Sequence, residues 1–175
     1  MDALILESAA LKIHPNVANP FLLFIAKILS KILPRLKIAK AKSCDLSRSN
    51  EVCLAKETLS CEFGDNGGTT ALAVVSGIKA QKEVNSKLVD IDCPTLIATG
   101  TEDHMADKEG SISAASAIPK RFDSFLRKMR TIKLLSVLKV YDGAYHVLHD
   151  ELEETTKQLV EDVADFLLEN KFYTK

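Results

Sequence analysis

The amino-acid sequence predicts an α/β protein in which helices cover a parallel sheet. Three short runs rich in Leu, Ile and Val have the composition of buried strands: residues 3–6, 95–99 and 134–141. None of these runs alternates strictly between apolar and polar residues, as is typical of parallel strands that are buried on both faces. Helical patterns lie between and after them, and this order requires crossover connections.

Four segments have helical patterns. The first begins at Asn19-Pro20, an N-cap residue followed by proline at the first helical position, and extends to about Leu33. The others are residues 69–80, 110–117 and 151–169. The last segment opens with acidic residues, which suit the positive end of a helix dipole. Its apolar face is formed by Leu159, Val163, Phe166 and Leu167.

The interval between the first two predicted strands is too long for one crossover and carries its own helices. We interpret residues 14–80 as a cap inserted above the carboxyl ends of the strands. The chain has 175 residues and a mass of 19.2 kDa, which fits a single domain or part of a larger one. We therefore expect residues 1–175 to form one domain.

Composition excludes several classes of protein. Lys and Arg number 23 against 24 for Asp and Glu, so no basic surplus indicates nucleic acid as a partner. The four cysteines are too widely spaced for a zinc or redox motif, and we expect no metal. The amino terminus lacks the basic region of a signal peptide, and basic residues interrupt the most apolar stretch, residues 21–36. We expect a cytoplasmic protein that is at most peripheral on membranes.

Candidate catalytic residues follow the second and third predicted strands. Asp103 lies in the loop after the second strand and His146 in the loop after the third. Reactive groups of α/β proteins cluster at the carboxyl ends of strands, and a carboxylate can orient a histidine that acts as a general base. The alternative is that both residues only form turns and helix caps.

Several short segments of the sequence resemble those of a known family. Residues 138–152 (LKVYDGAYHVLHDEL), 93–103 (CPTLIATGTED) and 24–34 (FIAKILSKILP), together with DLSR at 45–48, resemble the monoacylglycerol lipase branch of the α/β-hydrolases. The resemblance implies a partial α/β-hydrolase fold, with Asp103 and His146 as the acid and base of a serine triad. It also implies hydrolysis of monoacylglycerols to glycerol and fatty acid through an acyl-serine intermediate, without a cofactor.

The nucleophile of that family is missing from this sequence. The motif G-x-S-x-G needs a serine between two glycines, and the one pair with that spacing, Gly64 and Gly68, encloses Asn66. No His is followed by Gly, so the oxyanion loop is missing too. Ser8 has no glycine turn around it, and Ser76 lies in a helical pattern. The chain therefore resembles the C-terminal part of a hydrolase and is predicted to be inactive by itself. The alternative is a non-catalytic remnant that binds lipid surfaces or a protein.

The first helix of the cap has the pattern of a lid. Lys27, Lys31 and Arg35 recur every four residues and form one basic stripe. Apolar residues cover the rest of its circumference: Phe21, Phe24, Ile25, Ile28, Leu29, Ile32 and Leu33. Such a helix suits the membrane interface, where an acylglycerol would enter. The alternative is a helix packed on the sheet with its lysines in solvent.

Two further features concern surfaces. Three parallel strands leave an unpaired edge, so we expect the isolated chain to be marginally stable or to self-associate through that edge. Residues 120–133 contain six basic residues and one acidic residue. This stretch is either a small patch for anionic surfaces or a solvated insertion.

Overall fold

The computed structural model describes residues 3–15, 19–39, 43–62, 68–119 and 136–170. Its main sheet contains the parallel strands β1 (Leu4–Glu7), β4 (Thr95–Gly100) and β5 (Ser136–Tyr141), in the order β1-β4-β5. All three predicted strands are thus confirmed within two residues at each described end. The basic stretch 120–133 and the residues up to 135 lie outside the described residues.

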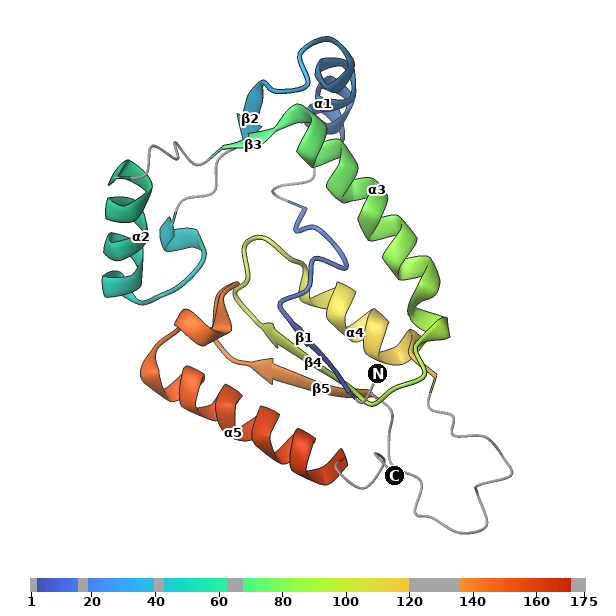
Figure 1. The fold of residues 1–175 in the computed structure, drawn as a ribbon, viewed down its shortest axis with the longest axis vertical. Coiled ribbons are helices and arrows are strands. Elements are labelled where there is room, and N and C mark those ends of the chain that lie inside the picture. The colour runs from blue at the N-terminus through green and yellow to red at the C-terminus, as the bar shows by residue number, and fades with distance from the viewer. Residues whose placement is uncertain (1–2, 16–18, 40–42, 63–67, 120–135, 171–175) are drawn as a thin grey trace.

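Strand β4 is the centre of the sheet, and all six of its residues are buried. Leu4 of β1 pairs with Thr95, and Thr95 pairs with Ser136 of β5. Ile97 and Ala98 point to opposite faces because successive side chains of a strand alternate. Ile97 packs with Leu88 and other buried residues on the face of the sheet that α4 (Lys108–Ala117) covers. Ala98 packs with residues that lie next to α5 (Glu153–Asn170), so the sheet is covered on both faces (Figure 1).

Helix α5 confirms the predicted C-terminal helix and most of its apolar face. Leu159 and Phe166 are buried and Val163 is half-buried, but Leu167 is exposed. The helix begins at Glu153 rather than at Glu151, which lies buried before it.

The segment between β1 and β4 contains the helices α1 (Pro20–Ile32), α2 (Asn50–Glu62) and α3 (Ala71–Lys87). The predicted N-cap residue of helix α1 is confirmed, because the Asn19 side chain accepts a hydrogen bond from Phe21 N at 2.9 Å. Helix α3 is longer than predicted and contains Ser76. Helix α2 was not predicted, because its apolar residues form no continuous face and two of its leucines are exposed.

Figure 1 shows α1 and α2 beyond the carboxyl ends of the main strands. Helix α1 packs against α3, and a small antiparallel pair joins β2 (Lys37–Ala39) to β3 (Thr69–Thr70). Helix α3 runs from this region down to the sheet and crosses residue 80, so the expected boundary of the cap falls inside a helix. The bounds of the cap remain a prediction. Among the described helices, none has the length and apolar character needed to cross a bilayer.

Candidate active site

The carboxylate of Asp103 is buried in the loop that follows β4. Its Oδ1 atom accepts hydrogen bonds from Met105 N at 2.7 Å and Ala106 N at 2.9 Å. Its Oδ2 atom lies 2.8 Å from Nδ1 of His146. The same side chain therefore builds the local turn with one oxygen and holds the histidine with the other.

The surroundings of Asp103 keep it ionised. Burial by itself would raise the pKa of this carboxyl group, but the hydrogen bonds from His146 and from the Ala106 and Met105 amides lower the pKa below its ordinary value of 3.8. An ionised Asp103 can only accept a hydrogen bond, so Nδ1–H of His146 donates to it and Nε2 is left as the basic nitrogen. The side chain that carries this nitrogen is 27% exposed.

The loops after β4 and β5 are held against each other by backbone contacts. Thr101 N donates to Tyr141 O at 3.0 Å and Glu102 N donates to Ala144 O at 3.1 Å. Gly100 permits this approach, because a Cβ atom at that position would overlap the carbonyl of Ala144. The pairing of Asp103 with His146 thus follows from the register of two neighbouring strands.

Ser8 does not complete the pair. It follows β1 directly, with a positive φ of 42°, and is buried. Its Oγ atom has no hydrogen-bond partner among the described residues, and these include His146. Gly64 and Asn66 lie outside the described residues.

A second carboxylate–histidine pair ties β1 to the histidine loop, which is formed by residues 142–150 after β5. Nδ1 of His149 lies 2.8 Å from Oε1 of Glu7, and His149 N donates to the same oxygen at 3.1 Å. Nothing in the local sequence pattern links His149 to Glu7, so this contact could not be predicted. His149 is exposed and Glu7 is half-buried, and the pair holds the end of β1 against the turn Leu148–Asp150.

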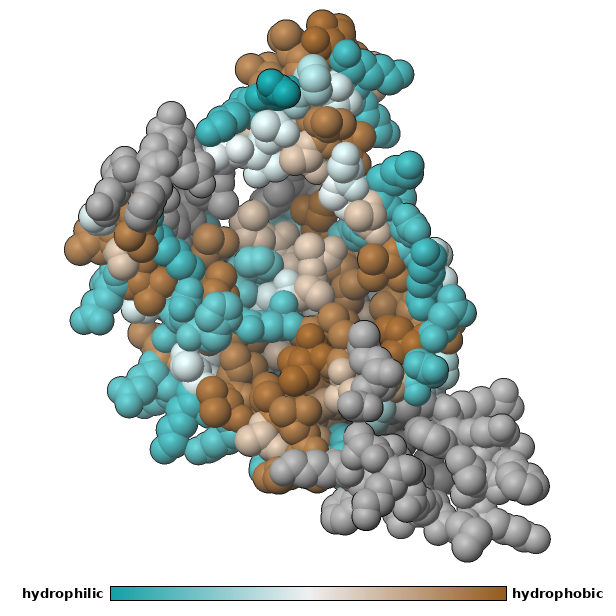
Figure 2. Space-filling model, in the orientation of Figure 1, coloured by the Kyte–Doolittle hydropathy of each residue, from teal (hydrophilic) through white to brown (hydrophobic). Residues whose placement is uncertain are grey.

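The structure places most of the predicted lid residues at the surface. Phe21, Phe24 and Ile32 are each more than 60% exposed. Ile28 and Leu33 are exposed as well, whereas Ile25 and Leu29 are half-buried. Figure 2 shows the apolar surface of α1 at the top of the molecule.

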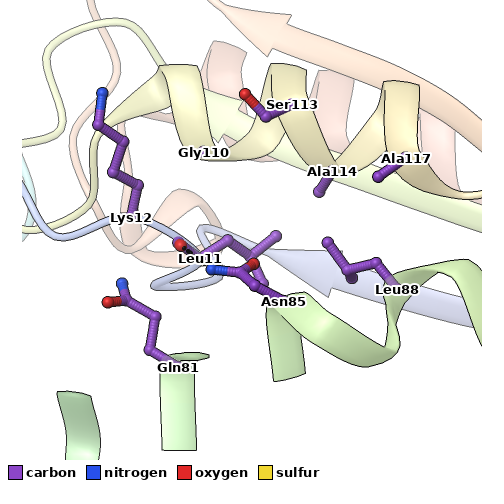
Figure 3. A pocket seen from close by; sticks show the side chains of 9 residues that line it. All are labelled: Leu11, Lys12, Gln81, Asn85, Leu88, Gly110, Ser113, Ala114 and Ala117. Carbon is purple, nitrogen blue, oxygen red and sulfur yellow. Dashed lines mark hydrogen bonds between the residues drawn. The ribbon is translucent and has the colours of Figure 1, made fainter. Parts of the chain in front are cut away.

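A groove of about 410 Å³ lies away from this site (Figure 3). It runs between α3, α4 and the segment that follows β1, and none of its lining residues is Asp103, His146 or a predicted lid residue. Gln81 and Asn85, which line it, donate to the backbone carbonyls of Ala10 and Leu11, each at 2.7 Å. In the part of the chain that the structure describes, no group of three His, Cys, Asp or Glu side chains is placed to hold a metal ion.

A buried aspartate after one parallel strand, bonded to a histidine after the next, is the arrangement of the acid–base pair in α/β-hydrolases. Comparison with known proteins identifies the family of the chain. A family model described as serine aminopeptidase, S33, matches residues 1–153, and the chain belongs to this family.

Named relatives agree with that assignment. The monoglyceride lipase of Homo sapiens is 30% identical over 165 residues, which cover 91% of this chain and 48% of that protein. The monoglyceride lipase of Rattus norvegicus is 26% identical over 164 residues, with coverages of 93% and 48%. The chain thus spans about half the length of the curated relatives it matches.

Solved structures confirm the predicted α/β-hydrolase fold. The monoacylglycerol lipase of Paleococcus ferrophilus matches with a TM-score of 0.69 at 18% identity, covering 98% of this chain and 60% of that one. A soluble variant of monoglyceride lipase from Saccharomyces cerevisiae, in complex with a substrate analog, matches with a TM-score of 0.67 at 19% identity. The match covers 97% of this chain and 54% of that one.

Proposed function

We propose that residues 1–175 supply the acid–base half of a serine ester hydrolase that acts on monoacylglycerols. The observation that carries this proposal is the 2.8 Å contact between Nδ1 of His146 and the buried carboxylate of Asp103. The serine and the oxyanion donors come from a segment outside residues 1–175, since the sequence contains neither motif. By itself, the 175-residue chain is inactive.

The two residues act together during catalysis. Nε2 of His146 removes the proton from the serine as its oxygen attacks the ester carbonyl, and Asp103 stabilises the imidazolium that forms. His146 then gives this proton to the leaving glycerol oxygen. Water, activated by the same histidine, releases the fatty acid from the acyl-serine. No cofactor takes part in these steps.

The substrate class rests on the relatives and on helix α1. The relatives are named monoglyceride lipases, and the exposed apolar side chains of α1 suit the acyl–water boundary of a membrane. Lys27, Lys31 and Arg35 are exposed as well and add attraction to anionic headgroups. The protein is cytoplasmic and binds membranes peripherally through α1.

A second function is favoured by the sheet edge. β1 is an edge strand of the described sheet, and Ile5 at its centre is 39% exposed. An open edge of this kind pairs readily with another chain. A non-catalytic role in binding a protein or a lipid surface, with self-association through β1, therefore stands beside the hydrolase.

The intact mass and the labelling of the native protein distinguish the hydrolase from the binding role. An antibody to residues 139–152 captures it from its source, and its intact mass and labelling by a fluorophosphonate are measured. The hydrolase proposal expects a species several kilodaltons or more above 19.2 kDa that is labelled on a serine outside this sequence. A native species of 19.2 kDa that begins at Met1 and takes no label would overturn it and favour the binding role.

A further inference from the structure

The carboxylate of Glu151 is a buried junction between the cap and the histidine loop. Its side chain is fully buried. Oε2 accepts from Arg48 Nε at 2.8 Å and from Leu152 N at 3.2 Å. Oε1 accepts from Tyr145 N at 2.9 Å and from Arg48 N at 3.2 Å. Burial alone would raise the pKa of Glu151, but the bonds from Arg48 and from these backbone amides lower it below its ordinary value of 4.5.

Arg48 reaches this junction from the other side. Beyond its two bonds to Glu151, its guanidinium donates to Thr155 Oγ1 at 3.1 Å. Its Nη1 atom would lie 3.0 Å from a Cβ atom placed on Gly143, so the guanidinium lies close against the turn that opens the histidine loop. Gly143 has a φ of +67°, which most residues adopt only at a cost.

These contacts hold the backbone on both sides of His146. Tyr145 N, immediately before it, donates to Glu151, and Val147 N, immediately after it, donates to Leu46 O at 2.8 Å. Ser47 Oγ donates to Asp150 O at 2.5 Å in the same loop. Residues 46–48 therefore clamp the loop from a position about a hundred residues earlier in the chain.

We propose that Arg48, through Glu151, is a positioning residue that fixes the His146 ring against Asp103. The proposal rests on the proposed function, in which this ring is the acid–base group. Arg48 makes no hydrogen bond to His146 or Asp103 among those the structure shows, so it acts only through the Tyr145 peptide that Glu151 anchors. Displacement of a catalytic group by about 1 Å costs roughly a hundredfold in rate, so the backbone beside the histidine needs such anchors.

The ring proton on Nδ1 of His146 reports the effect directly. The full chain is labelled with ¹⁵N, and exchange of this proton with water is followed by NMR in Arg48→Lys and Thr155→Val. Lysine cannot donate in the fixed pattern of a guanidinium, so we expect the proton in Arg48→Lys to exchange roughly tenfold faster. Thr155→Val removes one bond to Arg48 and leaves its pair with Glu151, so the change there is smaller.

Lys56→Met is the matched control. Lys56 forms an ion pair with Asp150 at 2.7 Å, which also joins α2 to the histidine loop but does not anchor Tyr145 or Val147. The control keeps the exchange rate of the wild type. Equal acceleration in Lys56→Met and Arg48→Lys would overturn the proposal, because general loosening of the cap would then explain both. An unchanged rate in folded Arg48→Lys would overturn it as well.

Amide exchange in the unmodified chain covers the case in which Arg48→Lys does not fold. The clamp requires the Tyr145 and Val147 amides to be protected as well as those of α5. Exchange at the rate of an open loop at both positions would overturn the clamp. All of these readings are made without substrate, so they stand even if the native protein proves not to hydrolyse esters.

Discussion

Asp103 and His146 lie in different loops, yet Oδ2 of the first and Nδ1 of the second are only 2.8 Å apart. The partner strands β4 and β5 pair in register from Thr95 to Gly100 and from Ser136 to Tyr141, so their following loops leave the sheet side by side. The other oxygen of Asp103 is occupied by two backbone amides. The carboxylate is therefore held in place by contacts other than the one to the histidine.

Replacement of Asp103 by asparagine tests this orientation. An amide can present its NH₂ group to Nδ1 of His146, which favours the wrong tautomer, and the same change in a serine protease lowers kcat about 10⁴-fold. The proposed function expects a comparable loss in Asp103→Asn, measured as monoacylglycerol hydrolysis by the serine-containing form that this proposal requires.

Asp107→Asn is the matched control for this substitution. Asp107 lies in the same loop, caps α4 and pairs with Lys12 at 2.6 Å, without a bond to His146. It should cost stability of less than about 2 kcal/mol and little of kcat. Equal losses of kcat in the two variants would contradict the role of Asp103.

Stability of the chain should fall in acid. Asp103 and Glu151 have pKa values below their ordinary ones in the folded state. A carboxylate with a depressed pKa stabilises the fold above its unfolded pKa, and this contribution is lost as the pH falls through the folded value. We therefore expect the free energy of unfolding, measured by urea titration, to decrease below about pH 4.5.

The Asp103→Asn variant also separates the contribution of Asp103 to stability in acid from those of the other acidic groups. Asp103→Asn should lower stability at neutral pH and flatten the dependence on pH, since this position no longer titrates. If the free energy of unfolding falls with the same slope in acid in the wild type and in Asp103→Asn, the depressed pKa of Asp103 is contradicted.

The lid role of α1 predicts specific loss of membrane binding. Phe24 is 61% exposed on α1, and Leu54 is 67% exposed on α2. Burial of a large apolar side chain contributes about 1.5–3 kcal/mol, so Phe24→Glu should weaken binding to phosphatidylcholine–phosphatidylserine vesicles at least tenfold. Leu54→Glu is the control and should leave co-sedimentation with the vesicles unchanged. Equal binding by both variants would count against α1 as the contact.

The parts of the fold that could be predicted from sequence are those with a local signature. The strands are short apolar runs, and Asn19-Pro20 marks the start of α1. Helix α2 was missed because only part of one face is buried, so its sequence lacks the helical periodicity of apolar residues.

The residues of the site likewise divide into those with a local sequence signature and those without one. Asp103 and His146 could be predicted because each follows a recognisable strand and matches a family string. Arg48 with Glu151, and Glu7 with His149, are contacts between residues more than a hundred positions apart. No local pattern pairs such residues, and the sequence pattern by itself predicts Glu151 in the first turn of a helix. These pairings follow only from the way residues 46–48 and β1 meet the histidine loop.

Self-association of the 175-residue chain should depend on β1. Leu4 N and Ser8 N donate to Pro94 O and Ala98 O of the neighbouring segment, each at 2.8 Å. Alternate residues of a strand point their N–H groups to opposite sides, so those of Ile5 and Glu7 face the open edge. Lysine blocks strand edges in natural proteins, so Ile5→Lys should shift the chain toward monomer in sedimentation velocity.

Val140→Lys is the comparison for the opposite edge of the sheet. Val140 is 48% exposed on β5, and its replacement adds the same charge. We expect this variant to associate as the wild type does, because the proposed contact lies at β1. Dissociation by Val140→Lys but not by Ile5→Lys would place the contact at β5. A monodisperse wild-type monomer with a sharp cooperative melt would show instead that the three-stranded sheet is stable with its edge open.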